Sequence, residues 1–151
     1  DHFEIVDLER RPPRSPYDAS VAGILSFGRM IDKGRAHLAQ RLSVYYFGED
    51  SGFDRRILEH LGITQEQFEK GLSEHATDDA VLGWLQPQLE AAAGKVDDLN
   101  ETLQSLSPDN VRDFLRGAVR KLDPARTDLD TFMAFSELDD VVTFARLHSH
   151  V

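Results

Sequence analysis

Signals for the start of an α-helix recur along the chain, and they constrain its fold more than any other feature. Thr64 is followed three residues later by Gln67, which is the spacing of a capping box. Thr77 precedes two aspartates, and acidic side chains are favoured in the first turn of a helix. Residues 107–109 read Ser-Pro-Asp, another sequence typical of a helix start. Together these signals predict several short helices rather than a sheet.

The clearest helix is predicted over residues 27–42. Apolar residues recur on one side of it at helical spacing, and they are Phe27, Met30, Ile31, Leu38 and Leu42. The other side carries Arg29, Lys33, Ala36 and Gln40. The pattern therefore predicts an amphipathic helix with a charged side.

The segments before and after this helix differ from it in composition. Residues 10–16 contain three prolines, which lack an N–H and favour extended geometry at the preceding residue, so we expect residues 1–17 to form an arm that packs on the domain. Asp18 or Ser20 can then cap a helix that begins at about Val21. Residues 43–47 are β-branched and aromatic, but no second strand-like segment pairs with them. We expect an extended connector that packs its aromatic rings.

Further turn and cap residues divide the rest of the chain. Asp54 or a neighbour starts a short helix that Gly62 ends, Pro87 breaks or restarts the helix that follows Thr77, and Asp128 caps a last one. With 151 residues, 40% of them hydrophobic, the chain can bury a core without metals or disulfides. The predicted fold is all-α: a single compact domain of about seven short helices over residues 18–151, with an extended aromatic connector.

Composition excludes several classes of site and partner. The chain has no cysteine, which excludes disulfides, thiolate catalysis and zinc sites that need Cys ligands. Its net charge of −10 opposes binding to nucleic acid or to an anionic membrane. Residues 1–41 carry seven Lys/Arg against six Asp/Glu, and residues 42–151 carry ten against twenty-one. An anion site should therefore draw mainly on the first third of the chain.

The sequence also favours a cytoplasmic protein without cofactor or metal. Residues 1–14 are charged throughout, unlike a signal peptide, and the apolar stretches are far shorter than the roughly 20 residues that a bilayer span needs. Sequence motifs for dinucleotides, phosphate loops, esterases and zinc proteases are absent. His148 and His150 form a close pair without a nearby third ligand, which is weak evidence for a metal.

The densest polar cluster lies on the predicted helix at residues 27–42. Arg29, Asp32 and Lys33 stand at i, i+3 and i+4 and so share a face, where Asp32 can orient cations that meet a carboxylate or phosphate. Arg35 lies nearer the apolar border, where a partly buried guanidinium would need an acidic partner or a ligand. The alternative is an ordinary solvated face with weak ion pairs along the helix.

Two further candidates follow this helix. Tyr45 carries a phenol that can orient a ligand or act as an acid, although packing at the edge of the core explains it equally. Asp54 and Arg56 could place a carboxylate and a cation beside the same site. The alternative for Asp54 is a helix start, where an acid is expected in any case.

A family resemblance covers residues 7 to about 85. The chain resembles a bacterial family catalogued as domain of unknown function 5069 at the following positions: Arg14-Ser15-Pro16, the string Arg-Met-Ile-Asp-Lys-Gly-Arg-Ala at residues 29–36, Tyr45, Asp54, Arg56 and Leu61-Gly62-Ile63. Longer members have a tail similar to residues 129–140. The resemblance implies no reaction, and Gly34 stands where relatives usually have Ala. The residues that carry the resemblance include the same polar residues that the spacing identifies, and they also include Arg14.

The working hypothesis is a binding site for a small anionic molecule, in an enzyme or in a sensor. Arg29, Lys33 and Arg35 would hold the anion, with Arg14 and Arg56 as further contacts. If the protein is an enzyme, proton transfer by Asp32, Tyr45 or Asp54 is the chemistry that these side chains support without a cofactor. Whether it is an enzyme stays open.

The rival hypothesis is a non-catalytic protein-interaction or scaffold domain. Its acidic C-terminal half would dock a basic partner, and its charged helix would be structural. An exposed acidic face with Phe132, Phe135 or Phe144 would favour this alternative, whereas a pocket at the charged cluster would favour the small-molecule site.

Overall fold

A computed structural model describes residues 6–43, 45–105 and 137–140 of the chain. These residues contain helices and turns and no strand, so the all-α prediction is confirmed for them. The elements, in order, are α1 (Phe27–Leu38), η1 (Gly48–Asp50), α2 (Gly52–Leu61), α3 (Gln65–Glu74), α4 (Asp78–Trp84), α5 (Gln86–Ala91), η2 (Ala93–Lys95) and α6 (Val96–Ser105). A further short helical segment covers residues 137–140.

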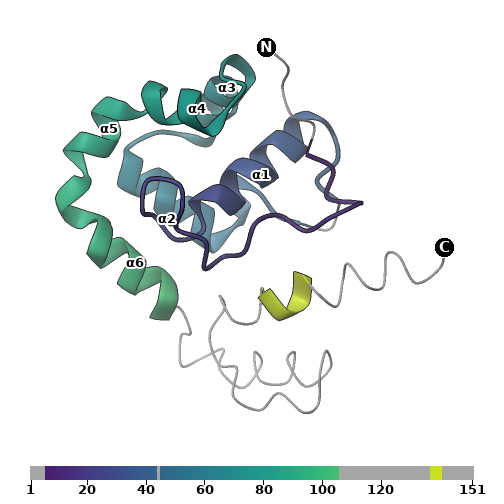
Figure 1. Cartoon of the computed structure of the whole chain (residues 1–151), viewed down its shortest axis with the longest axis horizontal. Coiled ribbons are helices and arrows are strands. Elements are labelled where there is room, and N and C mark those ends of the chain that lie inside the picture. The colour runs from purple at the N-terminus through teal and green to yellow at the C-terminus, as the bar shows by residue number, and fades with distance from the viewer. Residues whose placement is uncertain (1–5, 44, 106–136, 141–151) are drawn as a thin grey trace.

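Helices α1 and α2 form the centre of the fold. The chain from α3 to α6 runs along one side of them, and the N-terminal segment winds across another (Figure 1). Contacts join α1 to α3 and to α2, and α6 to α2. The core between them includes Phe27 and Met30 of α1, Ile57 of α2 and Phe68 of α3, none of which is exposed. The ring of Phe68 lies 6.3 Å from that of Phe27 and 6.2 Å from that of Phe47.

Most of the predicted helix boundaries are confirmed, because short-range hydrogen bonds decide them. Thr64 and Gln67 form both bonds of the capping box, and Thr77 Oγ1 accepts a hydrogen bond from the Ala80 N–H at 3.1 Å. Gly62 ends α2 with φ 70°, in the left-handed region that favours glycine. Pro87 lies in the first turn of α5, which begins at Gln86, and α4 ends at Trp84, so the helix restarts there as predicted.

The helix predicted from about Val21 is wrong. Residues 16–17 and 20–23 form turns, and Ala22 and Gly23 have φ angles of 58° and 70°, which a right-handed helix does not allow. Asp18 instead uses its Oδ1 to accept hydrogen bonds from the N–H and the hydroxyl of Ser20, so it stabilises a turn.

Helix α1 is also shorter than predicted at its C-terminal end. It stops at Leu38 rather than at residue 42, and Gln40, with φ 58°, turns the chain away. In the connector that follows, Phe47 is buried while Tyr46 is 71% exposed, so only part of the predicted ring packing occurs. The predicted helix starts at residues 107–109 and at Asp128 lie outside the described residues.

Gly34 has a packing role in α1. A Cβ at this position would collide with the side chain of Leu72 in α3 and press on the Phe47 ring. The glycine therefore permits the close approach of α1 and α3. No helix in the described part of the chain is both long enough and apolar enough to cross a bilayer.

Candidate functional site

The charged side of α1 lies inside the fold. Arg29, Asp32, Lys33 and Arg35 are each between 4% and 8% exposed. The interpretation of these residues as a solvated face is therefore wrong for the described structure. A buried charge is stable only with a partner, so the identity of each partner decides what the cluster can do.

Asp32 is held by the N-terminal arm. Its Oδ2 accepts hydrogen bonds from the Arg14 backbone N–H at 2.9 Å and from Arg14 Nε at 3.1 Å, and its Oδ1 accepts one from Nη2 at 3.2 Å. Arg14 Nη1 also donates to Asp78 Oδ2 at 2.9 Å. Burial acts to lower the pKa of Arg14, but hydrogen bonds to Asp78 and Asp32 outweigh it and raise the pKa above its usual value. Arg14 thus clamps the arm onto α1 and the start of α4.

Gly28 is needed for this clamp. A Cβ at Gly28 would lie 3.0 Å from the Arg14 guanidinium carbon and from its Nε. The glycine in the first turn of α1 therefore leaves room for the guanidinium to lie flat against the helix.

Lys33 pairs with Asp54 of α2, and both are almost fully buried. Lys33 Nζ lies 2.9 Å from Asp54 Oδ2, which also accepts the Gly48 N–H at 3.0 Å. Asp54 Oδ1 is buried and has no hydrogen-bond partner. Burial raises the pKa of Asp54 and lowers that of Lys33, in each case against the attraction of the partner. The pair joins α1 to α2 deep inside the protein.

Arg29 pairs with the segment at residues 137–140. Its Nη1 and Nη2 both donate to the carboxylate of Asp140, the second at 3.0 Å. The Arg29 guanidinium also lies over the Tyr45 ring, 5.6 Å from the centroid. Burial and then the charge of Asp140 raise the pKa of Tyr45, so the phenol keeps its proton. Near neutral pH it can donate a hydrogen bond but is not a general base.

Arg35 bonds to the last turn of α3. Its Nη1 donates to the Leu72 carbonyl at 3.4 Å and its Nη2 to the His75 carbonyl at 3.0 Å. A cation is favoured at a helix C-terminus, where carbonyls lack partners within the helix. Arg56 plays a more local part, since its Nη1 donates to the Gly52 carbonyl of its own helix at 3.1 Å.

A pocket of about 430 Å³ opens where the arm, α1 and the α3–α4 connection meet, and we call it the arm pocket. Its lining residues are Arg11, Arg14, Asp32, Arg35, Ala76, Thr77 and Asp78. The pocket thus brings together three of the residues singled out from the sequence, namely Arg14, Asp32 and Arg35. Arg29, Lys33, Tyr45, Asp54 and Arg56 are not among its lining residues.

Arg11 and Asp78 also line the pocket, and neither was predicted from the sequence. Arg11 lies in the Pro/Arg-rich arm and is 3.9 Å from Asp32, close enough for an ion pair. Asp78 was interpreted only as an acid in the first turn of a helix, which it is. Nothing in the spacing of either residue shows that the arm and α4 meet. Within the described residues, no three His, Asp or Glu side chains group in a way that could hold a metal ion.

Comparison with models of known protein families gives one informative result. Residues 10–142 match the family described as domain of unknown function (DUF5069). The match begins at residue 10 and continues well past residue 85, where the resemblance was expected to end, so it takes in residues 10–17 of the arm, all six described α-helices and Asp140. No curated protein matches the chain.

Proposed function

The chain belongs to the DUF5069 family, and we propose that it binds a small anionic molecule in the arm pocket. One observation carries the proposal: guanidinium groups from two separate segments, the arm and α1, border a single pocket of about 430 Å³. The guanidinium is the side-chain group best suited to paired hydrogen bonds with a carboxylate or phosphate.

Two of the three arginines, Arg14 and Arg35, are held in position before any ligand arrives. Arg14 is fixed by Asp32 and Asp78, and Arg35 is fixed by the Leu72 and His75 carbonyls. A binding group that is already ordered loses less conformational entropy when it binds. Three arginines and two aspartates line the pocket, so its charge is positive within a chain of net charge −10.

Arg11 is the proposed main anion contact, and Arg35 adds its charge at the wall of the pocket, where its Nη1 and Nη2 donate to the Leu72 and His75 carbonyls. The hydrogen bonds of Arg14 to Asp32 and Asp78 use Nε and both terminal nitrogens, so we assign it the role of holding the pocket together. The side chain of Arg11 is 43% exposed, lies 3.9 Å from Asp32 and lines the pocket, so a ligand that enters the pocket can reach it.

The size and charge of the site favour a small ligand over a polyanion. Pockets for small molecules span about 300–1,000 Å³, and the arm pocket falls in the lower part of that range. The acidic remainder of the chain repels an extended polyanion such as nucleic acid. A small carboxylate or phosphate therefore fits better.

The proposal concerns binding, and acid–base chemistry is a further possibility that depends on Asp32. Among the three candidates for proton transfer, Asp32 alone lines the arm pocket. Both of its oxygens accept hydrogen bonds from Arg14, an arrangement that suits a positioning role. Tyr45 and Asp54 interact with Arg29 and Lys33 instead.

Arg11 and its neighbour Arg10 provide a matched pair of variants that tests the proposal. Isothermal calorimetry and thermal shift with sulfate, phosphate and small dicarboxylates would compare the wild type with Arg11→Gln and Arg10→Gln. Arg10 has an 84% exposed side chain, pairs with Asp7 and does not line the pocket. We expect at least one anion to raise the melting temperature, Arg11→Gln to weaken binding by about tenfold because one charge-assisted contact is lost, and Arg10→Gln to bind as wild type does.

Two outcomes would contradict the proposal. One is that no anion stabilises the wild type. The other is that Arg10→Gln and Arg11→Gln weaken binding equally, since that would indicate a general effect of surface charge. In either case the interaction-domain hypothesis takes precedence.

A further inference from the structure

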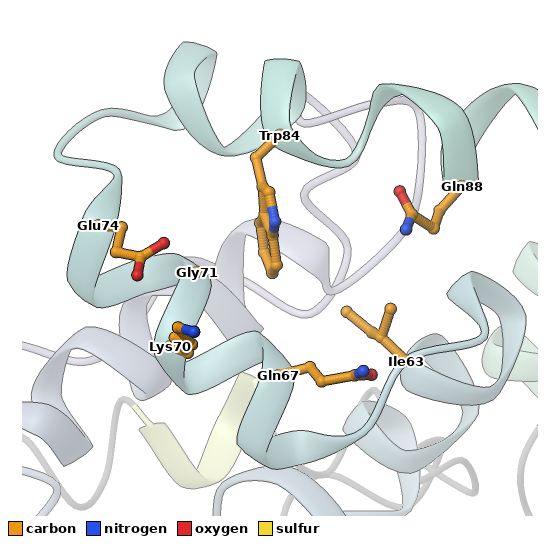
Figure 2. Close-up of a pocket in the computed structure, with 7 residues that line it drawn as sticks. All are labelled: Ile63, Gln67, Lys70, Gly71, Glu74, Trp84 and Gln88. Atoms are coloured by element: carbon orange, nitrogen blue, oxygen red, sulfur yellow. The ribbon is translucent and has the colours of Figure 1, made fainter.

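A second pocket, of about 270 Å³, lies between α3, α4 and α5, and we call it the Trp84 pocket. Its lining residues are Ile63, Gln67, Lys70, Gly71, Glu74, Trp84 and Gln88. It shares no lining residue with the arm pocket. Figure 2 shows the Trp84 indole extending from α4 towards α3, with Ile63, Gln67 and Gln88 on one side of it. An aromatic wall therefore faces an apolar residue and two amides.

The indole is locked in place from two directions. The ring of His75 stacks on it, with centroids 5.5 Å apart and an interplanar angle of 19°. Its outer edge lies directly over Gly71, where a Cβ would collide with the ring. Because His75 does not line the pocket, the indole surface in the pocket is the part that His75 leaves uncovered. That surface is a rigid platform for a flat ring.

The two amides present complementary hydrogen-bonding groups. Gln67 Oε1 already accepts the Thr64 N–H at 2.9 Å in the capping box, so its Nε2 is the group that remains to donate. Gln88 Oε1 is buried without a hydrogen-bond partner, a costly condition for an amide oxygen. In Figure 2 the Gln88 nitrogen, and not its oxygen, is on the side of Ile63, so the amide must rotate to bring Oε1 into the pocket. After that rotation, a ligand that accepts one hydrogen bond and donates another would satisfy both amides.

Charge adds a further constraint on the ligand. Lys70 and Glu74 line the pocket with opposite signs and lie four residues apart on α3, within reach of each other. Their charges cancel, so the pocket favours neither a cationic nor an anionic ligand. This distinguishes it from the arginine-lined arm pocket.

We propose that the Trp84 pocket binds a neutral planar ring with an amide-like edge, stacked on the indole and hydrogen-bonded to Gln67 and Gln88. The amide carbonyl of the ligand accepts from Gln67 Nε2, and its amide N–H donates to Gln88 Oε1. The inference is independent of the arm pocket, and either can fail without the other.

The single tryptophan of the chain makes the test specific, because the ¹H–¹⁵N spectrum contains one indole N–H signal. The probes are benzamide, which has a planar ring and an amide, and cyclohexanecarboxamide, which has the same amide on a non-planar ring. We expect benzamide to move the indole signal in a saturable manner and cyclohexanecarboxamide to bind more weakly, because it cannot stack.

Gln88→Leu removes the unpartnered oxygen and keeps the size of the side chain. We expect it to weaken benzamide binding by about tenfold, the effect of one lost hydrogen bond, without destabilising the fold. Gln86→Leu is the matched control, since Gln86 is exposed on the same helix and does not line the pocket. No saturable shift of the indole signal with benzamide, or equal binding by wild type and Gln88→Leu, would overturn the proposal.

Discussion

Helix α1 and the helices α3 to α5 show two different ways of placing polar side chains. At the N-terminal ends of α3 and α4 the capping side chains bond locally: Thr64 bonds to Gln67, and Thr77 bonds to the Ala80 N–H. On α1 they reach far along the chain, since Asp32 pairs with a residue 18 positions away and Arg29 with one 111 positions away. The first arrangement stabilises single helices, whereas the second ties separate segments to one another.

This difference has an energetic consequence. A cap at a helix end remains partly in water and contributes about 1 kcal/mol. A buried ion pair is costly to break from one side, because the remaining charge has neither water nor a partner. Substitutions on the charged side of α1 should therefore affect the whole fold, and substitutions at the caps should affect it modestly.

The largest effect is expected for Lys33→Ala. It leaves the Asp54 carboxylate buried without its partner, and breaking a buried pair in this way costs about 3–5 kcal/mol. Urea denaturation followed by circular dichroism at pH 7 measures the change in the free energy of unfolding. A loss of less than about 1 kcal/mol would contradict the burial of this pair.

The loss caused by Lys33→Ala should also depend on pH. Burial raises the pKa of Asp54 above its ordinary value of 3.8, and the charge of Lys33 opposes that rise, so the pKa rises further in the variant. A group whose pKa is raised by folding contributes stability below its unfolded pKa and loses that contribution as the pH rises through the folded value. We therefore expect the destabilisation to be smaller at pH 4 than at pH 7. An equal loss of stability at both pH values would argue against Asp54 as the buried charge that loses its partner.

A smaller effect is expected for Arg14→Ala. It removes the donors to the buried Asp32 and to Asp78, which should cost about 1–3 kcal/mol. Arg10→Ala is the control, because its exposed pair with Asp7 should contribute less than about 0.5 kcal/mol. Equal losses of unfolding free energy in the two variants would show that the ion pairs of Arg14 contribute no more than an exposed surface pair. The comparison uses the same denaturation measurement.

The smallest effect is expected at the cap of α3. Thr64→Ala removes the acceptor for the Gln67 N–H and should cost about 1 kcal/mol. Ser73→Ala, on the exposed side of the same helix, should be close to neutral, since its hydroxyl only bonds to the Lys70 carbonyl one turn back. A loss at Thr64 as large as that at Lys33 would remove the contrast between the two regions.

The same contrast explains what the sequence could predict. The capping box, the Thr77 cap, the Gly62 stop and the Pro87 restart depend on residues within four positions of one another, and all four were predicted correctly. The turns at residues 16–17 and 20–23 were missed because Ala22 adopts a positive φ angle that its residue type does not favour.

The candidate site shows the limit of spacing arguments more clearly. The spacing identifies the polar residues of α1 and predicts either cations that hold an anion or weak ion pairs along the helix. Instead each of Arg29, Asp32 and Lys33 found a partner in another segment. A one-dimensional pattern records which residues share a helix face, but not which distant segment covers that face. For this reason the sequence did not predict that Arg11 and Asp78 line the arm pocket.

The measurement that tests this account most directly is a pair of double-mutant cycles. One combines Lys33→Met with Asp54→Asn, a pair joined across the fold. The other combines Arg29→Gln with Asp32→Asn, which are three residues apart on α1. Arg29 bonds to Asp140 and Asp32 to Arg14, and the two share only a 3.3 Å bond from Arg29 to the Arg14 carbonyl. We predict a coupling energy of about 2 kcal/mol or more in the first cycle and less than about 1 kcal/mol in the second. The reverse order would contradict the claim that α1 is held by partners from distant segments.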